Sequence, residues 1–381
     1  MKKIMIAMSA GDWNGVQHRP HHFMKRASKA GWEVLYLEPP ATLLSPLKDK
    51  NMLQRWKNWA NGPRKIEDNL TVISSPPVLP FGNKYRAINK INQRIISQEL
   101  KKQLKNYTYS KVDLYSFLPN SVDTLEYIDF DKIIYDCVDD HAAFTGLINE
   151  DVVLKMEEEL SKSSHALVAT AKQLVEDRKN WGEFHLVPNG TEYEHFQPAE
   201  KKGNLLCPHD LPDTNKPILG FVGGISDWID LKSIEEVAKR MPEIQVIMIG
   251  PVDTDVENLK KLPNVTFLGP KQYTELPRYI QYFDVCLIPF KINKLTASVN
   301  PIKLYEYLST GKPVVSTPLP EVVVYNDVVH IGNNVEELVQ AIRISLTPEE
   351  NTEEKRNQRQ QVAQENSWDS RWEKVMKLIN G

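Results

Sequence analysis

The chain has 381 residues, of which 41% are hydrophobic and 25% charged, and its 47 Lys and Arg against 50 Asp and Glu leave a net charge of −3. This length suits two domains with hydrophobic cores of ordinary size, and the near balance of charge argues against a general nucleic-acid binder. The cysteines Cys137, Cys207 and Cys286 are scattered, without paired metal-ligand spacing, so we expect a reduced, cytoplasmic setting.

The first ten residues contain a short apolar run. It continues into Gly11 and Asp12, so a buried first strand over 4–7 is a better interpretation than a signal peptide. No stretch of the sequence is long enough to span a bilayer. A helix from Pro20 to Lys29 and a strand over 33–38 are expected next.

Apolar segments alternate with helical segments along the rest of the chain, which predicts α/β architecture with parallel sheets covered by helices on both faces. The expected strands are 4–7, 33–38, 70–73, 112–116, 132–135 and 165–169 in the first half, and 217–222, 245–249, 265–268, 283–289 and 313–316 in the second. The polar, proline-containing stretch 198–216 is the expected linker. We therefore expect one domain over 1–200, a second over 213–365, and a helix over 366–381 with Ser367 as its N-cap.

The loop after the first strand is rich in glycine and histidine. Glycine here, Gly15 included, allows close backbone approach to a phosphate, and Arg19 is a candidate partner for an anion. Three histidines between positions 18 and 22 lack carboxylate or cysteine partners, so we expect no metal.

Basic charge is concentrated between Pro46 and Lys105, where thirteen Lys and Arg stand against four Asp and Glu. Leu53, Trp56 and Ala60 recur at helical spacing there, near Trp59 and beside basic residues. The segment 46–105 therefore predicts binding to an anionic membrane surface. The alternative is a solvated basic face over a tryptophan-rich core contact.

Acidic residues follow the predicted strand 132–135. Carboxylates at the carboxyl end of a parallel strand face the ligand side of the sheet, and one with a raised pKa can act as a base. Asp139 is the first candidate for a catalytic base and Asp140 the second. The alternative is that both cap the next helix or face water.

The segment 300–316 predicts a loop, a helix, a tight turn and a buried strand in succession. Proline at a helix start, with free N–H groups around Ile302 and Lys303, suits a diphosphate. Glu306 shares a helical face with Lys303 and is placed to accept hydrogen bonds from a sugar diol. A lysine-glutamate pair on a solvated helix is the competing interpretation.

This segment resembles the carboxyl-terminal half of GT-B glycosyltransferases, which have two Rossmann-like domains with the ligand cleft between them. Glu306 matches the glutamate that usually binds the nucleotide ribose, and Pro188-Asn189-Gly190 resembles the segment that ends the acceptor domain. The resemblance implies that the nucleotide-sugar contacts come from a set of residues in both halves: Gly15, Arg19, Gly223, Gly224, Asn300, Pro301, Ile302, Lys303 and Glu306. It also implies that the last helix returns to the first domain; a helix that stays on its own domain is the alternative.

Two positions depart from the retaining members of this family. Ser298 replaces a second glutamate, and Gly223-Gly224 stand where a basic pair is usual. Lys303, Lys294 and Arg19 are the candidates for the missing charge. The stereochemical outcome at the anomeric carbon stays open.

The full pattern looks most like bacterial transferases of teichuronic acid or related polysaccharide synthesis. We therefore expect a cytoplasmic enzyme, peripheral at the inner face of the cell membrane, that moves a sugar from a UDP-sugar to a cell-surface glycan or lipid-linked acceptor. No cofactor or nucleic-acid partner is expected. A non-hydrolysing nucleotide-sugar epimerase on the same scaffold, or a non-catalytic partner protein, are the alternatives.

Overall fold

The computed structural model describes residues 1–50, 52–144 and 146–380. The chain divides into two compact units, which are residues 1–188 with 372–381 (unit 1) and residues 189–371 (unit 2). Asn51, in the predicted basic segment, and Gly381, at the end of the predicted last helix, lie outside the described residues.

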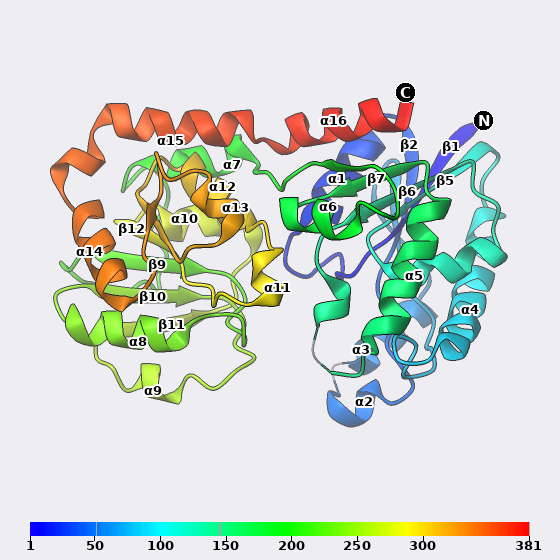
Figure 1. The fold of residues 1–381 in the computed structure, drawn as a ribbon, viewed down its shortest axis with the longest axis horizontal. Coiled ribbons are helices and arrows are strands. Elements are labelled where there is room, and N and C mark those ends of the chain that lie inside the picture. Colours follow the sequence, from blue (N-terminus) through cyan, green and yellow to red (C-terminus); the bar gives the residue numbers. More distant parts are fainter. Residues whose placement is uncertain (51, 145, 381) are drawn as a thin grey trace. The chain divides into compact units, whose positions relative to one another are not determined.

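Unit 1 is built on an eight-stranded sheet with the order β3-β4-β2-β1-β5-β6-β7-β8 (Figure 1). The neighbouring strands are parallel except for the antiparallel pair β3 and β4. The strands are β1 Lys2–Met8, β2 Trp32–Leu37, β3 Arg64–Glu67, β4 Leu70–Ile73, β5 Tyr109–Ser116, β6 Lys132–Cys137, β7 Ala166–Ala169 and β8 Phe184–Leu186.

Helices connect these strands and cover the sheet. They are α1 Arg19–Lys29, α2 Ser45–Lys48, α3 Met52–Ala60, α4 Arg86–Leu104, α5 Glu150–Ser163 and α6 Lys172–Arg178, with short 3₁₀ turns at Pro119–Glu126 and His141–Ala143. Apolar side chains of α4, α5 and the strands, such as Leu100, Met156 and Leu114, are fully buried together. The central strand β1 is buried from Ile4 to Met8, as expected for a parallel strand with helices on both faces.

Unit 2 contains a six-stranded sheet with the order β11-β10-β9-β12-β13-β14, and all its pairs are parallel. Its strands are β9 Ile218–Val222, β10 Gln245–Ile249, β11 Val265–Gly269, β12 Val285–Ile288, β13 Val314–Ser316 and β14 His330–Ile331. Its helices are α7 Tyr193–Phe196, α8 Leu231–Arg240, α9 Glu257–Lys260, α10 Leu276–Ile280, α11 Lys294–Ala297, α12 Ile302–Ser309, α13 Pro320–Val323, α14 Val335–Ser345 and α15 Glu353–Glu365. In both sheets the strand order reverses beside the first strand, and ligands bind at such switch points.

These two parallel sheets confirm the predicted α/β class. The predicted strands are present, while β3, β8 and β14 were not predicted. Those three are short edge strands of four, three and two residues, too brief to show a hydrophobic period.

The stretch 198–216, predicted to be a linker, packs within unit 2 instead. The buried amide of Gln281 accepts hydrogen bonds from the main-chain N–H groups of Gly203 and Leu205 at 3.1 and 3.0 Å, and Lys271 forms an ion pair with Asp210 at 2.5 Å. A polar, proline-containing segment is therefore held by side chains distant in sequence, which composition alone does not reveal.

The last helix, α16 Trp368–Asn380, begins in unit 2 and ends in unit 1. Ser367 caps it as expected, because its Oγ accepts a hydrogen bond from the Ser370 N–H at 3.2 Å. Among the described residues, no helix is both long and apolar enough to cross a membrane.

Candidate active site

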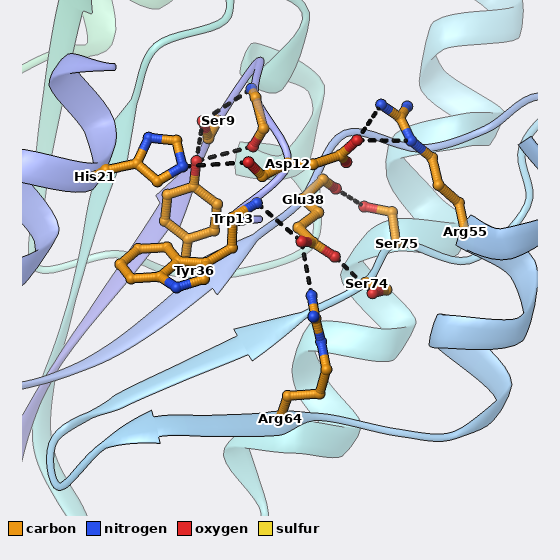
Figure 2. A network of polar contacts seen from close by, with 11 residues as sticks. Ser9, Asp12, Trp13, His21, Tyr36, Glu38, Arg55, Arg64, Ser74 and Ser75 are labelled. Atoms are coloured by element: carbon orange, nitrogen blue, oxygen red, sulfur yellow. Dashed lines mark hydrogen bonds and ion pairs between the residues drawn. The ribbon is translucent and has the colours of Figure 1, made fainter. Parts of the chain in front are cut away.

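The loop between β1 and α1 is held by a buried polar network, shown in Figure 2. The Trp13 N–H donates to Glu38 Oε1 at 3.0 Å, and the same carboxylate accepts from Arg64 at 2.7 Å and from Ser74 at 2.6 Å. The Tyr36 hydroxyl lies 2.8 Å from the carbonyl oxygen of Gly11. Glu38 follows β2, Ser74 follows β4 and Arg64 begins β3, so three strands fix this loop at the carboxyl edge of the sheet.

Gly15 lies in a tight turn of this loop. Its N–H donates to the Asp12 carbonyl at 3.0 Å, and a Cβ at position 15 would lie 3.1 Å from that oxygen. The Asp12 carboxylate accepts from Arg55 at 2.6 Å, which ties α3 to the loop (Figure 2). His21 Nε2 lies 3.2 Å from the Asp12 carbonyl oxygen, and burial lowers the pKa of this imidazole. The histidine ring therefore supports the turn.

Arg19 has another role than the predicted one. Its side chain is 2% exposed, its Nε donates to Asp136 at 2.7 Å, and Nη1 donates to the carbonyls of Val187 and Pro188 at 2.9 and 3.1 Å. Tyr115 donates to the same aspartate at 2.7 Å. A guanidinium neutralised inside unit 1 does not fit the prediction of an arginine available to an anion.

Asp139 and Asp140 follow β6, as predicted, but their surroundings differ. Asp140 is buried and lies 3.2 Å from the guanidinium of Arg178, which also pairs with the buried Glu157. Asp139 is half-buried, and burial together with the neighbouring Asp140 raises its pKa to about 7. Asp139 is thus suited to change its protonation state near neutral pH, whereas Asp140 is committed to an internal ion pair.

In unit 2, α12 places a cation and a carboxylate together near its start. Lys303 and Glu306 form an ion pair. Glu306 is 1% exposed, and its Oε1 has no hydrogen-bond partner among the described residues. Burial raises the pKa of Glu306, and Lys303 opposes that rise. A buried oxygen without a donor is costly, and a ligand hydroxyl would satisfy it.

Asn300 and Pro301 precede this helix and have structural roles. Asn300 Oδ1 accepts from the Asn189 N–H at 3.0 Å, and Asn189 Nδ2 donates to the Asn300 carbonyl at 2.7 Å. The Asn300 amide also lies 3.2 Å from Glu321, so its polar atoms are already engaged. Pro301 is the N-cap and Ile302 the first helical residue, one position later than expected.

Gly223 and Gly224 follow β9. Gly250, after β10, has φ +148°, and a Cβ there would lie 1.9 Å from the Gly223 carbonyl oxygen. The Gly223 N–H donates to the Ile249 carbonyl at 2.9 Å, so Gly223 allows the carboxyl ends of β9 and β10 to pack closely. Beside Gly224 a Cβ would meet only the Trp228 ring, at 3.7 Å.

Within unit 1 the structure brings the Gly15 loop and Asp139 to the same strand edge, and within unit 2 it brings Lys303 and Glu306 together. Sequence reasoning did not find two residues that support α12. Asn189 clamps the loop before it, and His195, on α7, helps to lower the pKa of Glu306. The Pro-Asn-Gly segment could have indicated the role of Asn189, whereas no pattern in the sequence indicated a role for His195.

Comparison with known proteins points to sugar transfer. Residues 216–347 match the family described as glycosyl transferases group 1. This match lies within unit 2 and covers most of it. TuaH of Bacillus subtilis, which bears the name of a teichuronic acid biosynthesis glycosyltransferase, is 32% identical over 207 residues, covering 50% of this chain. The chain spans about half the length of this curated relative, with 51% covered.

Solved structures share the fold over the whole chain. Sucrose-phosphate synthase from Thermosynechococcus elongatus superposes with a TM-score of 0.74 and 15% identity, covering 100% of this chain and 98% of that one. Anabaena HepE in complex with UDP-glucose gives a TM-score of 0.69 at 12% identity, covering both chains fully at 100%. An E. coli trehalose-6-phosphate structure bound with UDP-2-fluoro glucose gives a TM-score of 0.66 at 12% identity, covering 99% of this chain and 98% of that one. The fold is that of the GT-B glycosyltransferases.

Proposed function

We propose that this protein is a glycosyltransferase that moves a sugar from a UDP-sugar to a hydroxyl group of a cell-surface glycan or its lipid-linked precursor. The observation that carries the proposal is the unpartnered Oε1 of the buried Glu306, one turn beyond Lys303 at the start of α12. The group 1 match within unit 2 and the two fold neighbours whose structures hold UDP-sugars support a nucleotide-sugar donor.

In this proposal the α12 start receives the diphosphate. The N–H groups of Ile302 and Lys303 and the ammonium group of Lys303 provide positive charge there, and Glu306 accepts hydrogen bonds from the ribose hydroxyls. Gly224, whose surroundings are open, and the Gly15 turn are further candidates for donor contacts. No metal or other cofactor is part of the proposal.

Asp139 is the proposed base. The acceptor oxygen forms a bond to the anomeric carbon, the bond from that carbon to the diphosphate oxygen breaks, and the acceptor proton passes to Asp139 while UDP leaves. A carboxyl group whose pKa is about 7 can accept this proton near neutral pH and release it again.

The acceptor and the location are also proposals. The relative named for teichuronic acid biosynthesis supports a cell-surface polysaccharide. Exposed apolar side chains on and beside α2 and α3, including Leu47, Leu53 and Trp59, support peripheral binding to the inner face of the cell membrane.

The donor site is tested by titrating UDP into variants of the Lys303 and Glu306 pair. Glu306→Ala and Lys303→Ala should each weaken UDP binding by roughly 1.5 to 3 kcal/mol, because charge-assisted hydrogen bonds are lost. The matched control is the exposed pair of Glu236 and Lys239, 3.2 Å apart at the same sequence spacing. Alanine there should leave UDP affinity unchanged.

Thermal unfolding is followed for every variant, because Lys303→Ala leaves a buried carboxylate without its cation. Glu306→Gln, which keeps the side-chain volume, is the second test of the ribose contact. Unchanged UDP affinity in all three variants would contradict the assignment of α12 as the donor site.

A further inference from the structure

Unit 1 contains a cavity of about 660 Å³ at the carboxyl edge of its sheet. Residues after β1, β2, β4 and β5 line it, among them Ala10, Pro39, Val78 and Leu118, and α4 closes one side. Its volume is that of an ordinary small-molecule site. It lies at the sheet edge where open parallel sheets bind their ligands.

The lining of this cavity is unusual in its polar groups. Five carboxamide side chains line it, namely Asn83, Asn89, Asn92, Gln93 and Asn120. The lining residues that the structure describes include no charged side chain. Each carboxamide offers both a donor and an acceptor, as a sugar hydroxyl does, whereas burying a carboxylate or phosphate in an uncharged cavity is costly.

One of these amides has unused hydrogen-bonding capacity. Gln93 is 3% exposed, and its Oε1 has no partner in the described structure. Within the described residues, its side chain forms one hydrogen bond, a long one in which Nε2 donates to Asn89 Oδ1 at 3.4 Å. Asn120 Oδ1 is buried without a partner as well. The carboxamide oxygens of Gln93 and Asn120 can therefore each accept a hydrogen bond from a hydroxyl or amide donor.

The backbone around the cavity is held in a fixed shape. Asn92 donates to and accepts from the main chain of Leu79, both at 2.9 Å. Phe81, also in the lining, has φ +70°, a left-handed conformation that is strained for a non-glycine residue. Such strain concentrates at ligand sites, and the Phe81 ring adds an aromatic wall.

A second cavity lies beside the first and reaches toward the region of the proposed base. This smaller cavity, of about 90 Å³, shares Asn83, Leu118 and Asn120 with the first and reaches His141. The His141 N–H donates to the Asp139 carbonyl at 3.0 Å. The lining of the smaller cavity thus includes a residue of the turn that carries Asp139.

We infer that this cavity binds the acceptor as an uncharged saccharide unit, recognised through its hydroxyl or acetamido groups by Gln93 and Asn120. The inference rests on the proposed function and deepens it, because it states that the sugar bound here is neutral rather than a uronate or a sugar phosphate.

Matched glycosides test it on the full-length protein. The probes are octyl β-glycosides of glucose, galactose, N-acetylglucosamine and N-acetylgalactosamine, each below its micellar concentration, and octyl β-glucuronide and β-galacturonide. We expect at least one neutral probe to bind ten times more tightly than its uronide. Gln93→Leu should weaken that binding about tenfold, the effect of one lost hydrogen bond of about 1.4 kcal/mol. Gln98→Leu, an exposed glutamine on the same helix, is the control.

Titration with UDP in parallel separates the two proposals. The inference would be overturned, even where UDP binds well, by any of three results. These are no binding of any neutral probe, uronides that bind as tightly as the neutral sugars, or Gln93→Leu that binds as tightly as the unsubstituted protein. Selective binding of a neutral glycoside without any UDP binding would support the cavity and contradict the donor site.

Discussion

Asp139 is a residue whose chemistry depends on its neighbours. An isolated aspartate is ionised at neutral pH, but here burial and the adjacent Asp140 raise its pKa to about 7. Asp140 is held by Arg178 at 3.2 Å and is committed to an internal ion pair. Two consecutive acids, ranked first and second from the sequence, therefore have different surroundings in the fold.

Asp139→Asn should lower turnover by a factor of about 100 to 10,000 and leave UDP affinity nearly intact, because the base is lost and the donor contacts remain. In the unsubstituted protein, kcat/KM should rise as pH approaches about 7 and level off above it, since the ionised form acts. A pH profile without this rise, or a greater loss in Asp140→Asn, would reverse the ranking.

The ionisation of Asp139 should raise activity with pH but lower the stability of the folded protein. The folded pKa of Asp139, about 7, lies above the ordinary 3.8, so the folded protein binds the extra proton and loses stability as pH rises between those values. Asp139→Asn should therefore be more stable than the parent above pH 7, by at most about 4 kcal/mol, and equal to it below pH 3.8. Denaturant unfolding at several pH values measures this difference.

At the scale of elements, the strand ends decide where ligands can approach. The segments that follow β9 and β10 are in contact because Gly250, at φ +148°, has no side chain that would clash with the Gly223 carbonyl oxygen. Likewise, a Cβ on Gly190 would lie 2.7 Å from the Asn366 carbonyl oxygen. These contacts fix the turn after β9 and the chain at Gly190 against neighbouring backbone.

Gly250→Ala should destabilise unit 2 by more than about 3 kcal/mol, because the added Cβ would lie 1.9 Å from a carbonyl oxygen and the backbone must shift. Gly269→Ala is the control. It too has a positive φ, +66°, but nothing lies within 4 Å of its Cβ, so only about 1 to 2 kcal/mol is expected. If urea unfolding shows that both variants lose the same free energy of unfolding, then the positive φ, and not the contact with the Gly223 carbonyl oxygen, is the reason why position 250 needs glycine.

At the scale of the whole molecule, α16 belongs to both units, and each of its two parts carries a tryptophan. Trp368 is fully buried and belongs to unit 2, whereas Trp372 belongs to unit 1, with its ring centroid 5.5 Å from that of Phe23. Trp368→Ala should destabilise unit 2 and Trp372→Ala unit 1, each by about 3 to 5 kcal/mol. Hydrogen exchange of strands β9 and β1 reports the two losses separately. Loss in the same unit for both variants would contradict this division.

The proposed membrane binding rests on basic charges that the fold partly neutralises. Arg55, Arg64, Arg86 and Lys90 pair with carboxylates from outside the basic segment 46–105. Counting residues along the segment therefore overstates its free charge. The exposed Lys50 and Lys57 flank the apolar side chains of α2 and α3 and are better test positions than Arg55.

The protein should co-sediment with vesicles that contain anionic lipid and be released as salt rises, because the attraction is screened over about 10 Å at 0.1 M salt. Reversal of Lys50 and Lys57 to glutamate should weaken this binding and leave UDP affinity unchanged. Reversal of Lys239, exposed on α8, is the control. Equal binding to neutral vesicles, or none to either, would favour a soluble glycan acceptor.

The sequence by itself determined the α/β class, most strands, and the start of α12 with Lys303 and Glu306 on one face. These features depend on local periodicity and on helix geometry, which a short window of sequence contains. The features that the sequence did not predict are the short edge strands and the packing of the stretch 198–216. Both depend on partners far along the chain, such as Gln281.

Only the tertiary structure decided what each polar side chain does. Arg19 looks available in the sequence, but the fold buries it against Asp136, 117 residues away. Three carboxamides of the unit 1 cavity, Asn89, Asn92 and Gln93, recur at helical spacing on α4, but only the fold brings them together with Asn83 after β4 and Asn120 after β5. Charge, burial and hydrogen-bond partners are properties of the packed surroundings, and residues distant in sequence supply those surroundings.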